Sequence, residues 1–435
     1  MTVQTLQNDS LTLGVLPTQK FKAGLLSISI PVPISEEETP LSTLLLSVLR
    51  RGTCRYPTLE AINRRLDYLY GTDLANRNFY RGDTQFNGVC AEILDQAYLP
   101  SGEDLLPEIL EVVEQMLFHP LLDENGELLS RYVESEKQLQ CEAIRSLAND
   151  PATYSAERCR ELLYEGLPAG VPVYGSIEQI MAVTPRRLTE HWKKLMAAIT
   201  PVCFYVGSMP GERVFESLQT TFGRSLPIST LNRQSCNALP LPLGREVRRV
   251  EEDFESGQSH LLMAFRSDVT VDSPLFYAAM VYNELLGASP VSRLFTHVRE
   301  RLSLCYSCSS VYRPYKGILR IRCGLFRDNR EVAEREILCQ MQALATGAFD
   351  AVELDTAKNA LLHAYRQLED SAGALEGFYC DRTLVGKQES VEDCRRAILA
   401  VTREDVIAVA NSFEPQVTYF LRGVLDEEDE GNEDD

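Results

Sequence analysis

Residues 39–53 read TPLSTLLLSVLRRGT, and residues 56–74 continue as YPTLEAINRRLDYLYGTDL. In each stretch a threonine beside a proline precedes leucines at helical spacing, which predicts two consecutive helices. Upstream, FKAGLLSISIPVP alternates in the manner of a half-buried strand. The expected order at this end is a strand, two helices and two strands, over about 21–33, 39–51, 58–70, 72–80 and 83–94.

The second half of the chain repeats this order. It begins with an apolar stretch at about 259–267 and ends with the strand-like QVTYFL at 416–421. The repeated pattern, without obvious residue identity, predicts duplication of one α+β domain. The segments expected between these strands are helices at about 274–286 and 290–301, a hairpin at 304–313 and 316–325, and helices at 330–345, 351–369, 373–384 and 390–411.

A change in composition separates the two halves. Residues 223–246 contain prolines, few charges and no sustained period, which predicts a linker between domains at 1–222 and 247–425. The last ten residues, DEEDEGNEDD at 426–435, form an acidic tail that we expect to be disordered.

Charge and composition indicate which kinds of binding partner suit the chain. The chain has 435 residues with 63 Asp and Glu against 43 Lys and Arg, and this negative field repels phosphate backbones. We therefore expect no nucleic-acid partner, whereas basic or unfolded peptides suit the field. The longest apolar stretch, about Leu41–Leu49, is too short for a membrane span, and no secretion signal is visible. Twelve cysteines without a compact framework then predict buried thiols in a reducing cytoplasm.

Several short motifs resemble those of the insulinase- or pitrilysin-type (inverzincin) zinc peptidases. In that family the first helix carries HxxEH, followed within a few residues by a Gly-Thr pair. Gly52-Thr53, Tyr56-Pro57 and Gly71-Thr72 are similar to the family, and the resemblance extends over about 20–423. It implies an α+β fold of two homologous domains, each a mainly antiparallel sheet covered by helices on one face.

The residues that carry the family's chemistry are replaced. Counting back from Gly52, the two histidine positions fall on Thr43 and Ser47, and the glutamate position falls on Leu46. Hydroxyls are poor zinc ligands, and a leucine cannot activate a water. The family's third ligand, a glutamate on a later helix, aligns with Ala143, although a shift of one residue would bring in Glu142. We expect no metal, no cofactor and no catalysis.

A second pair of residues resembles the family's peptide-contacting groups. After LLGASPVSRLF at 285–295, Arg299 and Tyr306 stand seven residues apart, as do the family's arginine and tyrosine that reach toward bound peptide. A guanidinium and a phenol can both hold a carbonyl oxygen. The alternative interpretation is that both are surface and packing residues at a helix–strand junction.

Two further patterns are interpreted as structural. Cys305 and Cys308 form a CxxC on an expected strand, where residues three apart point to opposite faces, so we expect the sulfurs to diverge. The five histidines are never at metal-ligand spacing with one another in the sequence.

Among family branches, the chain most resembles small bacterial subunits that lack HxxEH. The resemblance implies a non-catalytic subunit that pairs with a related zinc peptidase bearing HxxEH and helps to bind peptide in a shared chamber, as a heterodimer or homodimer. Some members of that branch are associated with elongation factor P modification. The alternatives are a purely structural assembly subunit and an enzyme with an unrecognised site.

Overall fold

The computed structural model describes residues 2–100, 102–223, 225–226, 239–242 and 246–425. The predicted linker falls largely outside these residues, and the predicted acidic tail falls wholly outside them. The chain divides into two compact units, neither of which is continuous in sequence. Unit 1 holds Met1–Ile144, Val171–Cys236 and Leu368–Ser390, and unit 2 holds Arg145–Gly170, Asn237–Gln367 and Val391–Asp435.

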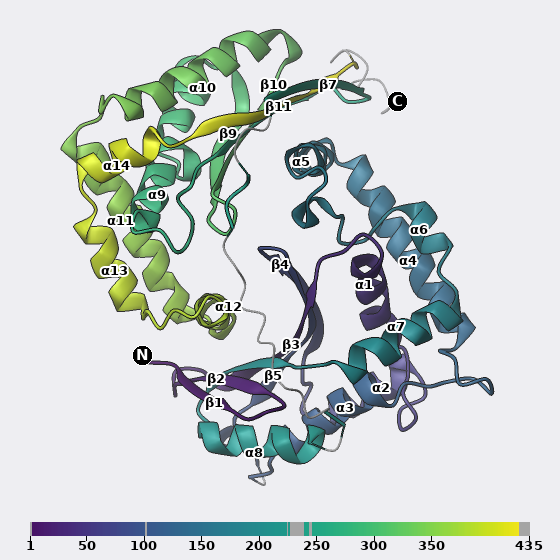
Figure 1. Cartoon of the computed structure of the whole chain (residues 1–435). Coiled ribbons are helices and arrows are strands. Elements are labelled where there is room, and N and C mark those ends of the chain that lie inside the picture. The colour runs from purple at the N-terminus through teal and green to yellow at the C-terminus, as the bar shows by residue number, and fades with distance from the viewer. Residues whose placement is uncertain (1, 101, 224, 227–238, 243–245, 426–435) are drawn as a thin grey trace, which may run out of the picture. The chain divides into compact units, whose positions relative to one another are not determined.

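Unit 1 is built on a six-stranded sheet in the order β1-β2-β6-β3-β5-β4 (Figure 1). All neighbouring pairs are antiparallel except β2 with β6. The strands are β1 (Gln4–Gln7), β2 (Thr12–Pro17), β3 (Ala23–Pro33), β4 (Leu74–Arg81), β5 (Thr84–Leu94) and β6 (Val202–Gly207).

The helices of unit 1 enclose one large core. Helix α1 packs against β5 and is buried at ten of its twelve positions, which explains its unbroken run of leucines. Leu44 and Leu45 are among the most buried side chains of the chain. The helices are α1 (Glu38–Leu49), α2 (Leu59–Tyr68), α3 (Leu106–Phe118), α4 (Ser130–Asn149, whose end enters unit 2), α6 (Ile177–Met181), α7 (Pro185–Ala197), α8 (Gly211–Phe222) and α12 (Ala372–Leu384).

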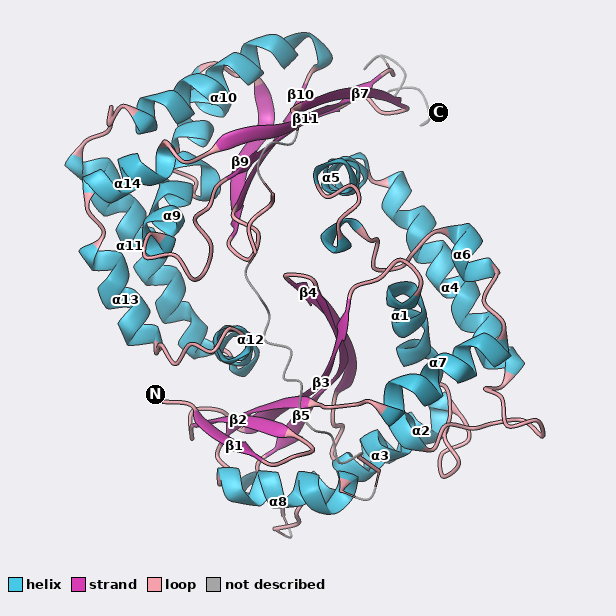
Figure 2. Ribbon diagram, viewed as in Figure 1, coloured by secondary structure: helices cyan, strands magenta, loops and turns pink. Residues whose placement is uncertain are grey.

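Unit 2 is built on a five-stranded sheet in the order β7-β11-β8-β10-β9 (Figure 2). Only the pair β7 with β11 is parallel. Its strands are β7 (Arg248–Phe254), β8 (Ser259–Arg266), β9 (Cys305–Arg313), β10 (Ile318–Leu325) and β11 (Glu414–Gly423). Its helices are α5 (Pro151–Leu163), α9 (Phe276–Asn283), α10 (Arg330–Ala345), α11 (Ala351–Gln367), α13 (Val391–Ala400) and α14 (Arg403–Ala410), with π-helical segments η3 (Glu284–Ala288) and η4 (Leu294–Arg301).

The expected α+β class, with two mainly antiparallel sheets, is confirmed. Each unit also contains a helix from the opposite half of the sequence. Helix α12 packs on β2, β3 and β6 in unit 1, and α5 packs on β8 and β11 in unit 2. In β8, Leu262 and Ala264 share a core cluster with α5, while the alternate residues Leu261 and Met263 are buried on the other face. The sheet of unit 2 is therefore covered on both faces, which corrects the expectation that helices cover only one face of each sheet.

The sequence prediction missed or misplaced several elements. Strands β1, β2 and β7 and helix α8 were not expected. The predicted helix at 390–411 is two helices, because Thr402 and Asp405 form a capping box that begins α14. Thr58 caps α2 by accepting from the Ala61 N–H, whereas α1 begins at Glu38, one residue before the expected cap. No described helix combines the length and apolarity that crossing a bilayer requires.

Candidate functional site

The Gly-Thr pair after α1 forms a tight turn that fixes the end of that helix. A Cβ on Gly52 would lie 2.5 Å from the Pro57 carbonyl oxygen, so only glycine fits. The Thr53 hydroxyl accepts a hydrogen bond from the Tyr56 N–H at 2.9 Å, and the Thr53 N–H donates to the Tyr56 carbonyl. This turn sets where the degenerate motif positions of α1 lie.

The first histidine position, Thr43, is buried and joins several segments of unit 1. Its hydroxyl lies 2.9 Å from the Val173 carbonyl and accepts from the amides of Asn78 at 2.7 Å and Gln85 at 3.1 Å. It also approaches the Thr39 carbonyl at 3.2 Å. A threonine hydroxyl offers one donor and two acceptor sites, so these neutral partners use its whole capacity.

The other degenerate motif positions also carry side chains that do not bind zinc. Leu46 is buried, and its carbonyl accepts from the Asn76 amide at 3.3 Å. Ser47 is half-buried on α1, and on α4 Ala143 is half-buried while Glu142 is exposed. Within the described ranges, no group of three His, Cys, Asp or Glu side chains could hold a metal ion.

A cavity of about 690 Å³ in unit 1 was not anticipated from the sequence. Ser42 and His191 lie on its wall, where the hydroxyl and the imidazole Nε2 are 2.9 Å apart. Burial lowers the pKa of His191, so its ring is kept neutral. Glu38 and Lys194 form an ion pair that also lines the cavity. The sequence alone does not indicate that Ser42 contacts His191, because the two residues are 149 positions apart.

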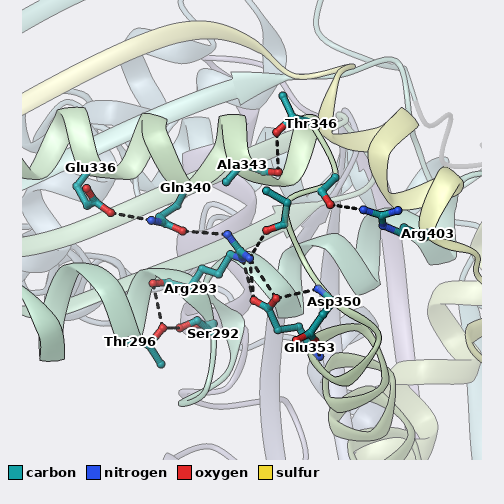
Figure 3. A network of polar contacts seen from close by, with 12 residues as sticks. Ser292, Arg293, Thr296, Glu336, Gln340, Ala343, Thr346, Asp350, Glu353 and Arg403 are labelled. Carbon is teal, nitrogen blue, oxygen red and sulfur yellow. Dashed lines mark hydrogen bonds and ion pairs between the residues drawn. The ribbon is translucent and has the colours of Figure 1, made fainter.

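In unit 2, Arg293 anchors the start of η4 (Figure 3). Its guanidinium bonds both carboxylate oxygens of Glu353, at 3.0 and 3.2 Å, and the Gln340 side-chain oxygen at 3.2 Å. Gln340 in turn donates to Glu336 at 2.7 Å. This network ties η4 to α10 and α11, and it thereby fixes the helical segment that carries Arg299.

Arg299 and Tyr306 lie on neighbouring elements, η4 and β9, and both are exposed. The guanidinium of Arg299 lies 4.6 Å from the centre of the Phe295 ring, and the Tyr306 ring is 4.9 Å from that of Phe326. Both side chains are therefore held by contact with a neighbouring aromatic ring. π-Helical geometry such as that of η4 is rare and is frequently found at functional sites.

The prediction that Cys305 and Cys308 diverge is wrong. Strand β9 contains a β-bulge at its start, because Leu325 pairs with Cys305 while the preceding Gly324 pairs with Ser307. The extra residue, Tyr306, changes the alternation of side chains, so Cys305 and Cys308 share a face. The bulge depends on the register with β10, which the CxxC alone does not reveal.

Comparisons with known proteins agree with this architecture. Residues 182–361 match the family model described as Peptidase M16 inactive domain. The "Probable inactive metalloprotease YmfF" of Bacillus subtilis (strain 168) is 27% identical over 420 residues, spanning 96% of this chain and 97% of that protein. The chain is similar to proteins of the M16 peptidase family. The resemblance to the insulinase- or pitrilysin-type family is thereby confirmed.

Solved structures share the fold of this chain. A conserved protein from Enterococcus faecalis V583 superposes with a TM-score of 0.88 at 22% identity, covering 97% of this chain and 99% of that chain. The peptidase M16 inactive domain from Pseudomonas fluorescens gives a TM-score of 0.79 at 17% identity, covering 98% and 99%. At these identities the likeness concerns the fold alone.

Proposed function

We propose that this M16 homologue is a non-catalytic subunit that pairs with an HxxEH-bearing zinc peptidase and helps to bind peptide in a shared chamber. The observation that carries the first part of the proposal is the environment of Thr43. Its hydroxyl is buried and fully engaged by two amides and a carbonyl. Such a group has no lone pair left for a metal.

The neighbouring motif positions support the same conclusion. A catalytic zinc site needs three nitrogen, sulfur or carboxylate ligands and a group that activates water. Leu46 supplies hydrocarbon, Ser47 a neutral hydroxyl and Ala143 a methyl group. This set does not fit zinc, and we derive no catalytic step through it.

The peptide-binding part of the proposal rests on Arg299 and Tyr306. Both polar groups are exposed on adjacent elements that the Arg293 network and the bulge hold in place. A guanidinium and a phenol can donate to the carbonyl oxygens of an extended peptide. The net charge of −20 adds attraction for basic or unfolded chains. The partner would be a related chain with an intact HxxEH in the same cytoplasm, giving a heterodimer.

Metal content tests the non-catalytic assignment. The purified chain is loaded with zinc, dialysed and measured by atomic spectroscopy, and we expect no tightly held zinc. Retention of about one zinc per chain, the stoichiometry of a catalytic site, would overturn the assignment and favour an enzyme with its own site.

Peptide turnover tests the binding role. The tagged chain is purified with its partner from the organism that encodes it, and cleavage of fluorogenic peptides by the complex is measured. We expect Arg299→Ala to lower kcat/KM by about tenfold, because a lost donor to a peptide carbonyl costs roughly 1–2 kcal/mol. Size-exclusion chromatography should show unchanged assembly.

Arg301→Ala is the matched control, since Arg301 is an exposed arginine on the same segment. It should leave turnover unchanged. Equal turnover by the Arg299→Ala and wild-type complexes would instead support a purely structural subunit that binds no peptide.

A further inference from the structure

Three cysteines of unit 2 lie together on one face of its sheet. Paired residues on adjacent antiparallel strands point to the same face, as do residues two apart on one strand. Cys308 pairs with Cys323, and Cys305 pairs with Leu325. Because residues 323 and 325 are two apart, Cys305, Cys308 and Cys323 share that face. All three are reduced.

The three thiols differ in exposure and in environment. Cys308 and Cys323 are buried, whereas Cys305 begins the edge strand β9 and is half-buried. Cys308 and Cys323 are directly opposite each other on β9 and β10, and Cys305 lies opposite Leu325, two residues further along β10. The neighbouring thiols of Cys308 and Cys323, and then the charge of Arg299, lower the pKa of Cys305 below that of an ordinary thiol.

We propose that Cys305, Cys308 and Cys323 form a peroxide-sensitive modification site, in which Cys305 is oxidised first and a neighbouring thiol then closes a disulfide. Cys305 is the most exposed of the three thiols. Both buried thiols lie on the same face of the paired strands as Cys305, so disulfide formation needs little movement of the sheet. This inference does not depend on the proposed peptide-binding role.

The chemistry takes two balanced steps. The Cys305 thiolate attacks a hydroperoxide, the O–O bond breaks, and an S–OH group and an alcohol or water are produced after protonation. The thiol of Cys308 or Cys323 then attacks the Cys305 sulfenic sulfur and releases water as the disulfide forms. Two electrons pass from the sulfurs to the hydroperoxide, and a dithiol reductant reverses the change.

Thiol loss after peroxide treatment tests the proposal on the full chain. The reduced protein is treated with hydrogen peroxide, quenched by alkylation under denaturing conditions and mapped by mass spectrometry. We expect a disulfide joining Cys305 to Cys308 or Cys323, with the loss of two thiols per chain. Cys305→Ser should slow thiol loss in this peptide region by about tenfold or more, since the reactive thiolate is gone.

Two variants keep the test decisive. Cys339→Ser removes an exposed cysteine of α10 outside the cluster and should leave the oxidation rate unchanged. Cys308→Ala/Cys323→Ala should leave Cys305 as a sulfenic acid that dimedone traps, because no resolving thiol remains. If Cys305→Ser loses thiols as fast as wild type, or if Cys54 and Cys339 are oxidised before Cys305, the proposal is overturned.

Discussion

At the scale of single residues, Thr43 is the point where one hydroxyl joins four segments of unit 1. It lies on α1 and bonds Asn78 of β4, Gln85 of β5 and the carbonyl of Val173 before α6. We expect Thr43→Val to lower the free energy of unfolding by about 1–3 kcal/mol, because the buried Gln85 amide and the half-buried Asn78 amide and Val173 carbonyl lose a partner. Denaturant titration measures the loss.

Matched substitutions separate the hydroxyl from the change of shape. Thr43→Ser keeps the hydroxyl and should lose less stability than Thr43→Val. Thr356→Val removes an exposed hydroxyl on α11 that bonds only within its helix, at 2.7 Å to the Val352 carbonyl, and should have little effect. Equal losses at positions 43 and 356 would show that the network contributes no special stability.

His191 gives the chain a pH dependence with a definite sign. Burial lowers the pKa of its imidazole below the ordinary value of 6.5, so the folded state holds it neutral. The unfolded state therefore binds the proton more readily, and stability is lost as the pH falls below about 6.5 toward the folded pKa. We expect His191→Gln to flatten the decline in the denaturation midpoint between about pH 7 and 5.

His363→Gln is the control for this effect, because His363 is an exposed histidine on α11. It should keep the wild-type pH dependence. A His191→Gln profile parallel to that of wild type would contradict the assignment of the acid-sensitive group.

The sequence predicted the position of the site residues better than their surroundings. The spacing from Gly52 is local, so Thr43, Leu46 and Ser47 could be placed on one helix from the sequence alone. The partners of Thr43 come from strands more than thirty residues away, and no local pattern identifies them. The face of β9 on which Cys305 lies was predicted wrongly for a related reason, because a bulge is a property of two paired strands.

At the scale of elements, a buried ion pair fastens α12 to the sheet of unit 1. The Glu376 carboxylate accepts from Arg77 at 2.5 Å and from the Ser27 hydroxyl at 2.6 Å, and its side chain is 2% exposed. Asp381 of the same helix pairs with Arg81 at 2.6 Å. On the other unit, Glu252 of β7 plays a comparable part, accepting from Arg158 of α5 at 2.8 Å.

We expect Glu376→Ala to lower the free energy of unfolding by about 3 kcal/mol, because it leaves Arg77 partly buried without its countercharge. The double variant Arg77→Leu/Glu376→Leu should recover much of that loss. Glu60→Ala, in the exposed pair with Arg64, should cost about 1 kcal/mol or less and serves as the control. A loss for Glu376→Ala as small as that control would argue against a fastening role.

Elements with strong local signals were predicted, and elements that depend on distant partners were not. Helices α1 and α2 follow from caps and leucine spacing, and the hairpin of β9 and β10 follows from alternation. Strand β7 reads RRVEEDF, without alternation of charged and apolar residues, and it pairs in parallel with β11, far along the chain. The capping box of Thr402 and Asp405 is a local sequence pattern, and it predicts the break between α13 and α14 inside the single helix expected at 390–411.

At the scale of the whole molecule, the exchanged helices lead to a test of how the halves depend on each other. The sequence predicted domains that divide at 223–246, whereas each compact unit includes one helix from beyond that boundary. We expect residues 1–222 and 247–435, expressed as separate chains, to co-purify through a tag on one of them. Helices α5 and α12 would each complete the core of the other fragment's unit.

The fragment carrying Glu376→Ala should co-purify less, because the α12 ion pair is lost. Fragments that elute separately, each folded by circular dichroism, would contradict the expectation. Repeated patterns in the sequence can reveal a duplication, but they cannot show which helix of each copy crosses over. That choice is made by long-range packing.

The exchange also bears on the order in which the chain is made. The sheet of unit 1 is synthesised by residue 207, yet α12, which packs on β3 and β6, ends at residue 384. At about 5–20 residues per second, a nascent chain would wait roughly ten to thirty seconds for that helix to be made. During this interval the Ser27 and Arg77 side chains stay uncovered, so the growing polypeptide presents an incomplete surface to ribosome-associated chaperones.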